Sequence, residues 1–304
     1  MSIRIMLFLL IAATTWGGEI TVSELEPCAQ EKTEPYFKDQ AAAVPMTITE
    51  SIYKTTPQGD LITRVYTPSS PASDKRRPCA LFFYGGGWRG GSLLQFSKHC
   101  EYLVSRGFVA MTPRYRGIET HHTTPREAAE DALSCVRWVR KHADELHIDP
   151  DRILVGGGSA GGHLAAATAT LTKIRDAQDD PSVSCRPNLL VLFNPAVNTG
   201  PETPQYERIS EYWQEFSPMH NMQKTMPDTV IFHGLSDNTV PTWTAREFSR
   251  ALEQTGAIST LYLYPEQKHA FFNEGSGNNP YFYDTMYRMG VFLEEQGWIA
   301  PETR

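Results

Sequence analysis

A serine set among glycines is the residue of this chain whose surroundings most strongly suggest chemistry. Ser159 is the centre of residues 157–161, Gly-Gly-Ser-Ala-Gly, which match the G-x-S-x-G spacing of a nucleophile elbow. An apolar run, residues 153–155, precedes this turn, and an Ala-rich segment, residues 163–171, follows it, which predicts a strand, a sharp turn and a helix. The turn needs neighbours without side chains because the chain doubles back around the serine. Free N–H groups at the start of the helix would then face a developing oxyanion.

A glycine-rich turn between a strand and a helix could instead cradle phosphate. The lysine of the G-x-x-x-x-G-K-[ST] pattern is missing here, and a G-x-G-x-x-G site would need an acidic residue after the next strand. We therefore favour a nucleophilic serine over a phosphate-binding or purely structural turn.

Two later loops supply an acid and a base. Asp237 follows an apolar run, residues 229–234, and His269 lies beyond another, residues 259–264, so both are expected past strand ends. A serine hydroxyl is a weak nucleophile until a base takes its proton, and a histidine base needs a carboxylate on its other ring nitrogen. The predicted catalytic triad is therefore Ser159, Asp237 and His269.

Other histidines and acids near these loops are assigned different roles. His163 is on the expected helix after the serine and is interpreted as a packing residue or as one that supports the triad from behind. His233 ends a strand and is expected to orient the loop of the acid. Asp228 and Glu266 are each placed on the wrong side of a strand. None of them displaces a member of the predicted triad.

A second glycine-rich turn is predicted to hold the oxyanion. Residues 85–87 are glycines that follow the apolar run 79–84, which fits a strand buried on both faces of a parallel sheet. Open α/β sheets place their sites at the carboxyl ends of strands, where glycines let backbone N–H groups approach a ligand oxygen. We assign the N–H groups of Gly86, Gly87 and Ala160 to the oxyanion hole. The alternative is a glycine-rich turn without a ligand.

The rest of the sequence predicts a frame for these loops. Thr124 and Pro125 indicate the start of a helix, as N-cap and first helical residue. The other elements predicted from apolar runs are strands near residues 47–53, 61–66, 108–113 and 189–193, and helices near residues 95–105 and 125–146. The first two strands are expected to pair antiparallel across a turn. The predicted fold class is α/β, with a mostly parallel central sheet flanked by helices.

One segment, about residues 195–226, has no clear period and is interpreted as a small insertion over the active site. It is rich in aromatic residues. The side chains predicted to line the substrate site are Trp88, Tyr206 and Trp213. The alternative, weighed equally for the insertion, is a cap whose aromatic rings form its own small core.

Taken together, these motifs resemble the α/β-hydrolase superfamily. The resemblance rests on the elbow, the G-G-G-W loop, the H-G-x-x-D-x-x-V-P segment from His233 and the K-H-A-F segment around His269, and it covers about residues 45–298. The nearest groups are the hormone-sensitive-lipase type and bacterial carbohydrate esterases similar to acetylxylan and feruloyl esterases. The former has a histidine where this chain has Tyr84 and an acid where it has Gly158. The resemblance implies the fold, the triad and ester hydrolysis, and leaves the acid and alcohol open.

The composition is that of an ordinary globular protein, with 304 residues, 40% hydrophobic and 21% charged. A formal net charge of −7 gives no support for a nucleic-acid or anionic-membrane partner. The adjacent His121 and His122 lack the spacing and the third ligand of a metal site, so neither a metal nor a cofactor is expected. An ester is the expected partner, and the oligomeric state is left open.

The N-terminus has the pattern of a secretory signal. Arg4 precedes an apolar core, residues 5–13, and small residues lead to a plausible cleavage point at about residue 18. The alternative is a membrane anchor, which the shortness of the apolar run disfavours. We predict a signal peptide over 1–18, a lead-in over 19–45 and the hydrolase domain over 46–304, in an exported protein of the periplasm or extracellular space.

The chain has five cysteines, and an odd number in an exported chain requires a free thiol or an intermolecular bond. Cys79 and Cys135 are expected to be buried as small apolar residues. A disulfide between Cys100 and Cys185, or one containing Cys28, is possible from the sequence.

The expected function is that of an exported serine esterase for short acyl groups, with acetyl groups on polysaccharide as the favoured substrate. The alternatives are a general carboxylesterase for small esters, a feruloyl esterase, and an inactive esterase-like binding protein. An intact triad argues against the last of these.

Overall fold

The computed structural model of the chain describes residues 18–25, 45–69, 75–275 and 279–301. Residues 1–17 of the predicted signal peptide and most of the predicted lead-in lie outside the described residues. The last residue of the predicted signal peptide and the first three of the lead-in form a strand, β1 (Gly18–Thr21), which the sequence analysis did not predict. It pairs in parallel with the strand of residues 259–264, where Gly18 lies opposite Thr260.

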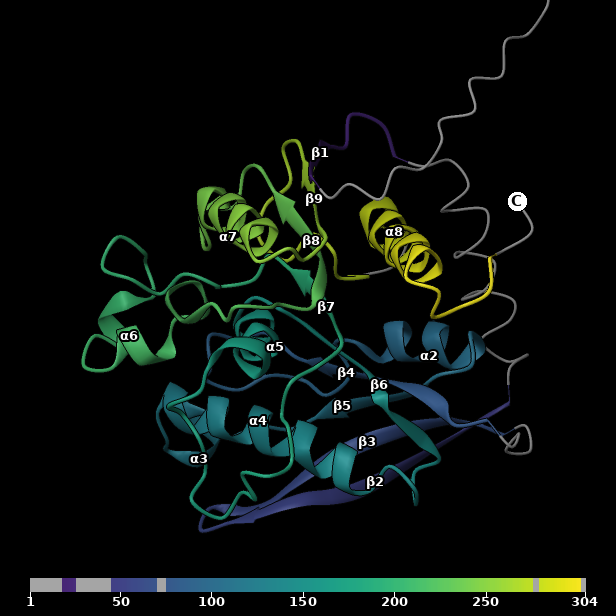
Figure 1. Cartoon of the computed structure of the whole chain (residues 1–304). Helices are drawn as coiled ribbons and strands as arrows, with labels where there is room; N and C mark the ends of the chain where they lie inside the picture. The colour runs from purple at the N-terminus through teal and green to yellow at the C-terminus, as the bar shows by residue number, and fades with distance from the viewer. Residues whose placement is uncertain (1–17, 26–44, 70–74, 276–278, 302–304) are drawn as a thin grey trace, which may run out of the picture.

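A nine-stranded sheet of described residues forms the centre of the molecule, in the order β1-β9-β8-β7-β6-β4-β5-β3-β2 (Figure 1). Only the β2–β3 and β3–β5 pairs are antiparallel, so the predicted mostly parallel α/β sheet is confirmed. The remaining strands are β2 (Met46–Thr56), β3 (Gly59–Pro68), β4 (Arg77–Phe83), β5 (Val109–Pro113), β6 (Ile148–Gly158), β7 (Leu189–Phe193), β8 (Asp228–Gly234) and β9 (Ser259–Tyr264).

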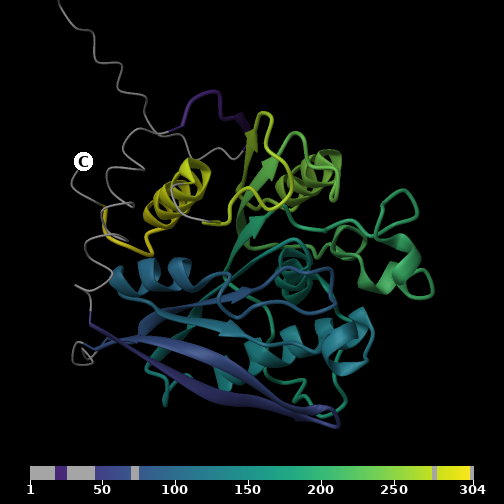
Figure 2. The ribbon, with the colours of Figure 1, turned by 180° about the vertical axis from the view of Figure 1, so that it is seen from behind.

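Helices cover both faces of this sheet (Figures 1 and 2). They are α2 (Ser97–Ser105), α3 (Ile118–His121), α4 (Pro125–Lys141), α5 (Ala160–Thr170), α6 (Trp213–Phe216), α7 (Thr242–Gln254) and α8 (Pro280–Glu295), with 3₁₀ turns η1 (Tyr206–Arg208) and η2 (Pro218–Asn221). One hydrophobic core lies under α4, α5 and α7, and the other lies under α2 and α8. Strand β4 feeds both cores, because Leu81 faces the first and Phe82 the second.

The start of α4 has the predicted capping arrangement. The Thr124 hydroxyl accepts a hydrogen bond from the Arg126 N–H, and the Glu127 carboxylate accepts one from the Thr124 N–H at 2.9 Å. Pro125 occupies the first helical position, where a missing N–H costs nothing. The helix ends at Lys141, before the predicted end at 146. The C-terminal helix α8 was not predicted.

The possible disulfide between Cys100 and Cys185 is wrong, because both residues are free thiols. Cys100 belongs to the core under α2 and α8, whereas Cys185 packs against the core under α4 and α5, so the sheet separates them. Cys79 and Cys135 are free and fully buried, as expected. Cys28 lies outside the described residues.

His99 on α2 is buried among aromatic rings, with ring-centroid distances of 4.9 Å to Phe96 and 5.2 Å to Phe193. Neither of its ring nitrogens has a hydrogen-bond partner in the described part of the chain. Burial lowers the pKa of His99 to about 3. The unfolded chain therefore binds a proton that the native chain does not, at pH values below the ordinary histidine pKa of about 6.5.

We expect His99→Leu to stabilise the protein, because an apolar side chain of similar size removes two unpaired polar atoms. The free energy of unfolding should rise by about 1 kcal/mol at about pH 7.5, and by about 1 kcal/mol more at about pH 5.5. The larger gain in acid follows because only the wild type loses stability by protonation of this histidine in the unfolded state. Urea unfolding of both proteins at the two pH values measures this. An equal difference at both would contradict it.

Candidate active site

The structure brings together the three residues of the predicted triad from three separate loops. Ser159 follows β6, Asp237 follows β8 and His269 follows β9. The distance from His269 Nε2 to Ser159 Oγ is 2.9 Å, and that from His269 Nδ1 to Asp237 Oδ2 is 2.7 Å. This geometry allows the histidine to take the serine proton while the carboxylate holds the opposite ring nitrogen.

Ser159 has the backbone of a nucleophile elbow, with φ 55° and ψ −119°, a conformation that L-residues rarely adopt. Its glycine neighbours are sterically required. A Cβ on Gly157 would lie 2.5 Å from the Gly161 carbonyl, and a Cβ on Gly161 would lie 2.0 Å from the carbonyl oxygen of Phe83. Helix α5 begins directly after the serine, at Ala160, as the turn geometry requires.

Backbone donors keep Asp237 ionised. Its Oδ1 accepts hydrogen bonds from the N–H groups of Thr239 at 2.8 Å and Val240 at 2.9 Å. Burial alone would raise the pKa of Asp237, but the hydrogen bond with His269 and the backbone donors outweigh it and lower that pKa below its ordinary value. The carboxylate is therefore charged whenever the histidine is needed as a base.

The structure supports the roles given to His233, His163 and Asp228, but the placement of Glu266 is wrong, because Glu266 follows β9 at the same end as His269, where it is exposed. His233 is fully buried and donates from Nε2 to the Val240 carbonyl at 2.9 Å, so it supports the loop of the acid. Burial lowers the pKa of His163 to about 4, and its Nε2 donates to the Phe216 carbonyl at 2.9 Å inside the core. Asp228 accepts from the Ile258 N–H at 2.8 Å, away from the triad.

Two side chains that the sequence analysis missed hold the loops around the predicted triad. Asn194, directly after β7, accepts a hydrogen bond at Oδ1 from the N–H of Ala270, the residue after His269, at 3.0 Å. Gln95 accepts at Oε1 from the Gly85 N–H at 2.7 Å and donates from Nε2 to Asn273 at 3.0 Å. A position directly after a strand end was the available signal for Asn194. Gln95 offered none, because its partners are remote in sequence.

The predicted oxyanion donors face the same cavity as the serine, which Gly86, Gly87 and Ala160 help to line. Gly86 has φ 126° and Gly87 has φ 61°, so this turn needs glycine. Among the hydrogen bonds of the described residues, none uses the N–H group of any of these three residues. They are free to bind a substrate oxygen, and their assignment to the oxyanion hole stays a prediction.

The cavity has a volume of about 960 Å³, and most of its lining side chains are polar. The polar residues around Ser159 are Arg89, Ser92, Gln95, Asn194, Gln205, Arg208, Asn238, Thr239, Asn273 and Glu274. Apolar contacts come from Leu94, Ala196, Pro204 and Phe272. The insertion of residues 195–226, drawn in green around α6 at the left of Figure 1, contributes Gln205 and Arg208 to this lining.

The prediction that aromatic side chains of the insertion line the substrate site is wrong. Tyr206 and Trp213 do not line the cavity and instead pack edge to face on each other, with ring centroids 6.3 Å apart. Trp88 borders the cavity, but it is only 1% exposed because its ring packs against His163 and Phe216. The aromatic residues of the insertion therefore serve mainly its own packing, which was the alternative interpretation.

His121 uses its ring within its own turn. The Gly117 N–H donates to its Nδ1 at 3.1 Å, and the Thr120 hydroxyl lies 2.7 Å from the same nitrogen. Across the described residues, no three His, Cys, Asp or Glu side chains are grouped as metal ligands would be. No helix among those residues has the length and apolarity to cross a membrane.

Comparisons with known proteins identify relatives of this arrangement. A family model described as BD-FAE matches residues 64–187. The solved structure of esterase 2 from Thermogutta terrifontis, phosphoramylated by tabun, is 38% identical, with a TM-score of 0.80 over 84% of this chain and 97% of that chain.

Curated relatives are more distant. Esterase LipC of Mycobacterium tuberculosis is 26% identical over 78% of this chain and 61% of its own length. The probable isoprenylcysteine alpha-carbonyl methylesterase ICMEL1 of Arabidopsis thaliana is 26% identical over 67% of this chain and 47% of its own length. The chain thus spans about half to three fifths of the length of these curated relatives.

Proposed function

We propose that this chain, which belongs to the esterase/lipase family of the α/β-hydrolase superfamily, hydrolyses carboxylic esters of short acids by a Ser-His-Asp acyl-enzyme mechanism. The observation that carries the proposal is the hydrogen-bonded series from Ser159 through His269 to Asp237 on a strained elbow. Fold alone would not choose a function, because many activities share this fold.

In the proposed reaction, Ser159 Oγ attacks the ester carbonyl while His269 Nε2 takes its proton. The oxyanion of the tetrahedral intermediate accepts hydrogen bonds from the N–H groups of Gly86, Gly87 and Ala160. His269 then gives the proton to the leaving alcohol, and the acyl group remains on the serine. A water molecule then gives a proton to His269 and attacks the acyl-enzyme, and His269 passes that proton to Ser159 Oγ as the acid is released.

Short acyl groups are supported by a relative. Thermogutta terrifontis esterase 2 has solved structures with propionate bound and with butyrate bound, at 36% and 35% identity to this chain. Its phosphorylation by paraoxon supports a reactive nucleophile in the related site. On this basis acetate to butyrate is the proposed acyl range.

For the alcohol we propose a polysaccharide bearing acetyl groups. The polar side chains around the cavity, including Gln205, Arg208 and Asn238, can hydrogen-bond sugar hydroxyls. The secretory pattern of residues 1–18 supports an exported enzyme that meets such a polymer. A general carboxylesterase for small esters is the second candidate, favoured by relatives named simply as esterases.

We expect wild-type protein to hydrolyse p-nitrophenyl acetate and butyrate faster than long-chain esters, and to release acetate from acetylated xylan. Ser159→Ala is the control, and it should lose both activities because, among the described residues, Ser159 Oγ is the hydrogen-bond partner of His269 Nε2. Initial rates across the chain-length series and acetate quantified after incubation with the polymer measure this.

Each outcome selects one of the candidate functions. Acetate release from the polymer that is lost in Ser159→Ala establishes a carbohydrate deacetylase. Cleavage of the small esters alone establishes the general carboxylesterase, and faster cleavage of methyl ferulate, assayed beside them, establishes the feruloyl esterase. No turnover by the wild type would contradict the proposed reaction and favour the inactive binding protein.

A further inference from the structure

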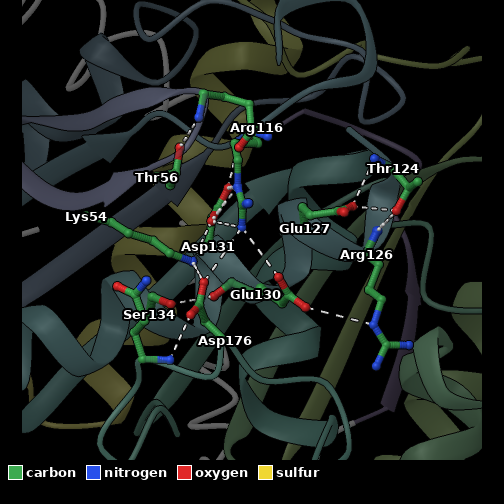
Figure 3. A network of polar contacts seen from close by, with 12 residues as sticks. Lys54, Thr56, Arg116, Thr124, Arg126, Glu127, Glu130, Asp131, Ser134 and Asp176 are labelled. Carbon is green, nitrogen blue, oxygen red and sulfur yellow. Dashed lines mark hydrogen bonds and ion pairs between the residues drawn. The ribbon is translucent and has the colours of Figure 1, made fainter. Parts of the chain in front are cut away.

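Figure 3 shows a buried ion pair between Arg116 and Asp131, and neither residue belongs to the lining of the cavity. Arg116, just after β5, donates from Nε to both carboxylate oxygens of Asp131 on α4, at 2.9 and 3.1 Å, and from Nη2 to Oδ1 at 2.8 Å. The backbone N–H of Arg116 donates to the same carboxylate at 2.8 Å. Asp131 is fully buried and Arg116 is 6% exposed. Four hydrogen bonds therefore fix both the side chain and the backbone of Arg116.

A second cation approaches Asp131 from another element. Lys54 on β2 places its Nζ 2.7 Å from Asp131 Oδ1 and 2.8 Å from Asp176 Oδ2. Figure 3 shows the two cations reaching Asp131 from different sides. Burying charges costs free energy, and replacing a buried pair by apolar residues is often neutral or stabilising, so stability alone is a weak reason for this pair.

The segment that contains Arg116 is hydrogen-bonded to the glycine loop, residues 84–89, which carries the predicted oxyanion donors Gly86 and Gly87. The Tyr115 hydroxyl donates to the carbonyl of Tyr84 at 3.1 Å, and the two rings stack with centroids 4.3 Å apart. Two residues beyond Arg116, the Ile118 N–H donates to the Trp88 carbonyl at 2.9 Å. Residues 115–118 therefore contact the glycine loop on both sides of Gly86 and Gly87.

The contact continues at Arg89, whose backbone N–H closes the turn of the glycine loop. The Glu119 N–H donates to the Arg89 carbonyl at 2.9 Å, and the Arg89 N–H donates to the Gly86 carbonyl at 3.1 Å. A Cβ on Gly117 would lie 2.4 Å from the Arg89 carbonyl oxygen, so the two segments touch without space for a side chain. A shift of residues 115–119 must move the turn that aims the Gly86 and Gly87 N–H groups.

We infer that Arg116 and Asp131 are positioning residues for the oxyanion hole. Their hydrogen bonds anchor residues 115–119 to α4, and that segment holds the glycine loop in the orientation that the tetrahedral intermediate requires. The inference rests on the proposed function, since it assigns Gly86 and Gly87 to the oxyanion. Such donors act only over a narrow range of distances, so a small displacement affects the transition state more than substrate binding.

The test compares variants of two cations that contact the same carboxylate. Arg116→Lys keeps the charge but loses the planar fork that binds both oxygens of Asp131. The double variant Arg116→Met with Asp131→Leu removes both charges together. It replaces Arg116→Lys in the test if that single variant does not fold. Lys54→Met is the matched control, because Lys54 binds Asp131 from β2, and no hydrogen bond or ion pair in the described part of the chain joins Lys54 directly to residues 115–119.

We expect both Arg116 variants to lower kcat for p-nitrophenyl acetate about 10- to 100-fold, with KM within about twofold of wild type. Affinity for an alkyl boronic acid, which forms a tetrahedral adduct with the serine, should fall by the same factor. Lys54→Met should lower the melting temperature and leave kcat and boronate affinity within about twofold. Folding of every variant is checked by circular dichroism.

The inference is overturned if the folded Arg116 variants keep wild-type kcat, or if Lys54→Met loses as much kcat as they do. Boronate affinity, measured by calorimetry, needs no turnover. Wild-type hydrolysis tests the proposed function, whereas the difference in boronate affinity between the Arg116 and Lys54 variants tests the positioning. Failure of one is therefore distinguishable from failure of the other.

Discussion

Replacing Asp237 with asparagine should lower kcat about 10⁴-fold while the protein stays folded. In the wild type, Oδ1 of Asp237 accepts from the N–H groups of Thr239 and Val240, so an asparagine would keep its amide oxygen there. Its Nδ2 would then face His269 Nδ1 as a donor. The histidine would have to accept on Nδ1 and carry its proton on Nε2, toward Ser159. In that tautomer it cannot take the serine proton.

Asp228→Asn is the matched control for this prediction. Asp228 lies at the opposite end of β8, and its Oδ1 accepts from the Ile258 N–H, a bond that the amide oxygen of asparagine can retain. We expect kcat for p-nitrophenyl acetate within about twofold of wild type in this variant. Initial rates with both variants at equal protein concentration, after thermal melts confirm folding, measure the difference. A similar loss in the two variants would show that Asp237 is not the triad acid.

The triad could be predicted from the sequence because each member is fixed by local pattern. An apolar run of strand length precedes each of Ser159, Asp237 and His269, and the carboxyl ends of parallel strands meet at one edge of the sheet. Residues that directly follow these strands in the sequence are therefore expected to lie close together in space. The same reasoning predicted Gly86 and Gly87 next to the serine.

Contacts between remote segments could not be predicted in this way. Asp131 meets Arg116 and Lys54 only because β5, β2 and α4 converge, and nothing in the period of α4 shows which of its polar residues turns inward. The prediction that aromatic side chains line the substrate site was wrong for a related reason. Composition identified Tyr206 and Trp213 as candidates, but which face of a short irregular turn carries its rings is decided by tertiary packing.

The two departures from the hormone-sensitive-lipase pattern have physical explanations. A Cβ on Gly158 would lie 2.4 Å from Cζ of Phe272, so the space of an acidic side chain is already filled by a ring. That ring stacks on Phe96 and packs against Phe193, with centroids 5.7 and 4.7 Å away, and so cannot withdraw easily. Tyr84 is equally committed, because its hydroxyl donates to the Tyr115 carbonyl at 3.3 Å.

Replacing Gly161 with alanine should strongly destabilise the fold. The new Cβ would lie 2.0 Å from the Phe83 carbonyl oxygen and 2.5 Å from that of Tyr84. Both obstacles are backbone atoms at the end of β4, so α5 would have to move away from the sheet. We expect the free energy of unfolding to fall by about 3 kcal/mol or more, and esterase activity to fall with it.

Gly158→Ala is the comparison that isolates this cause, because its obstacle is the Phe272 ring instead of backbone. Its loss of stability should be smaller, about 1–3 kcal/mol, and Phe272→Leu in the same chain should restore part of it. Phe272→Leu should restore nothing to Gly161→Ala. Urea unfolding of the four variants measures both comparisons.

A Gly161→Ala protein as stable as wild type would show that α5 can shift from β4, and the glycine would then serve only the turn. If instead it unfolds as expected, the second glycine of the elbow is what lets α5 pack directly on the end of β4, next to the glycine loop. That contact brings Ser159 and the N–H of Ala160 to the cavity.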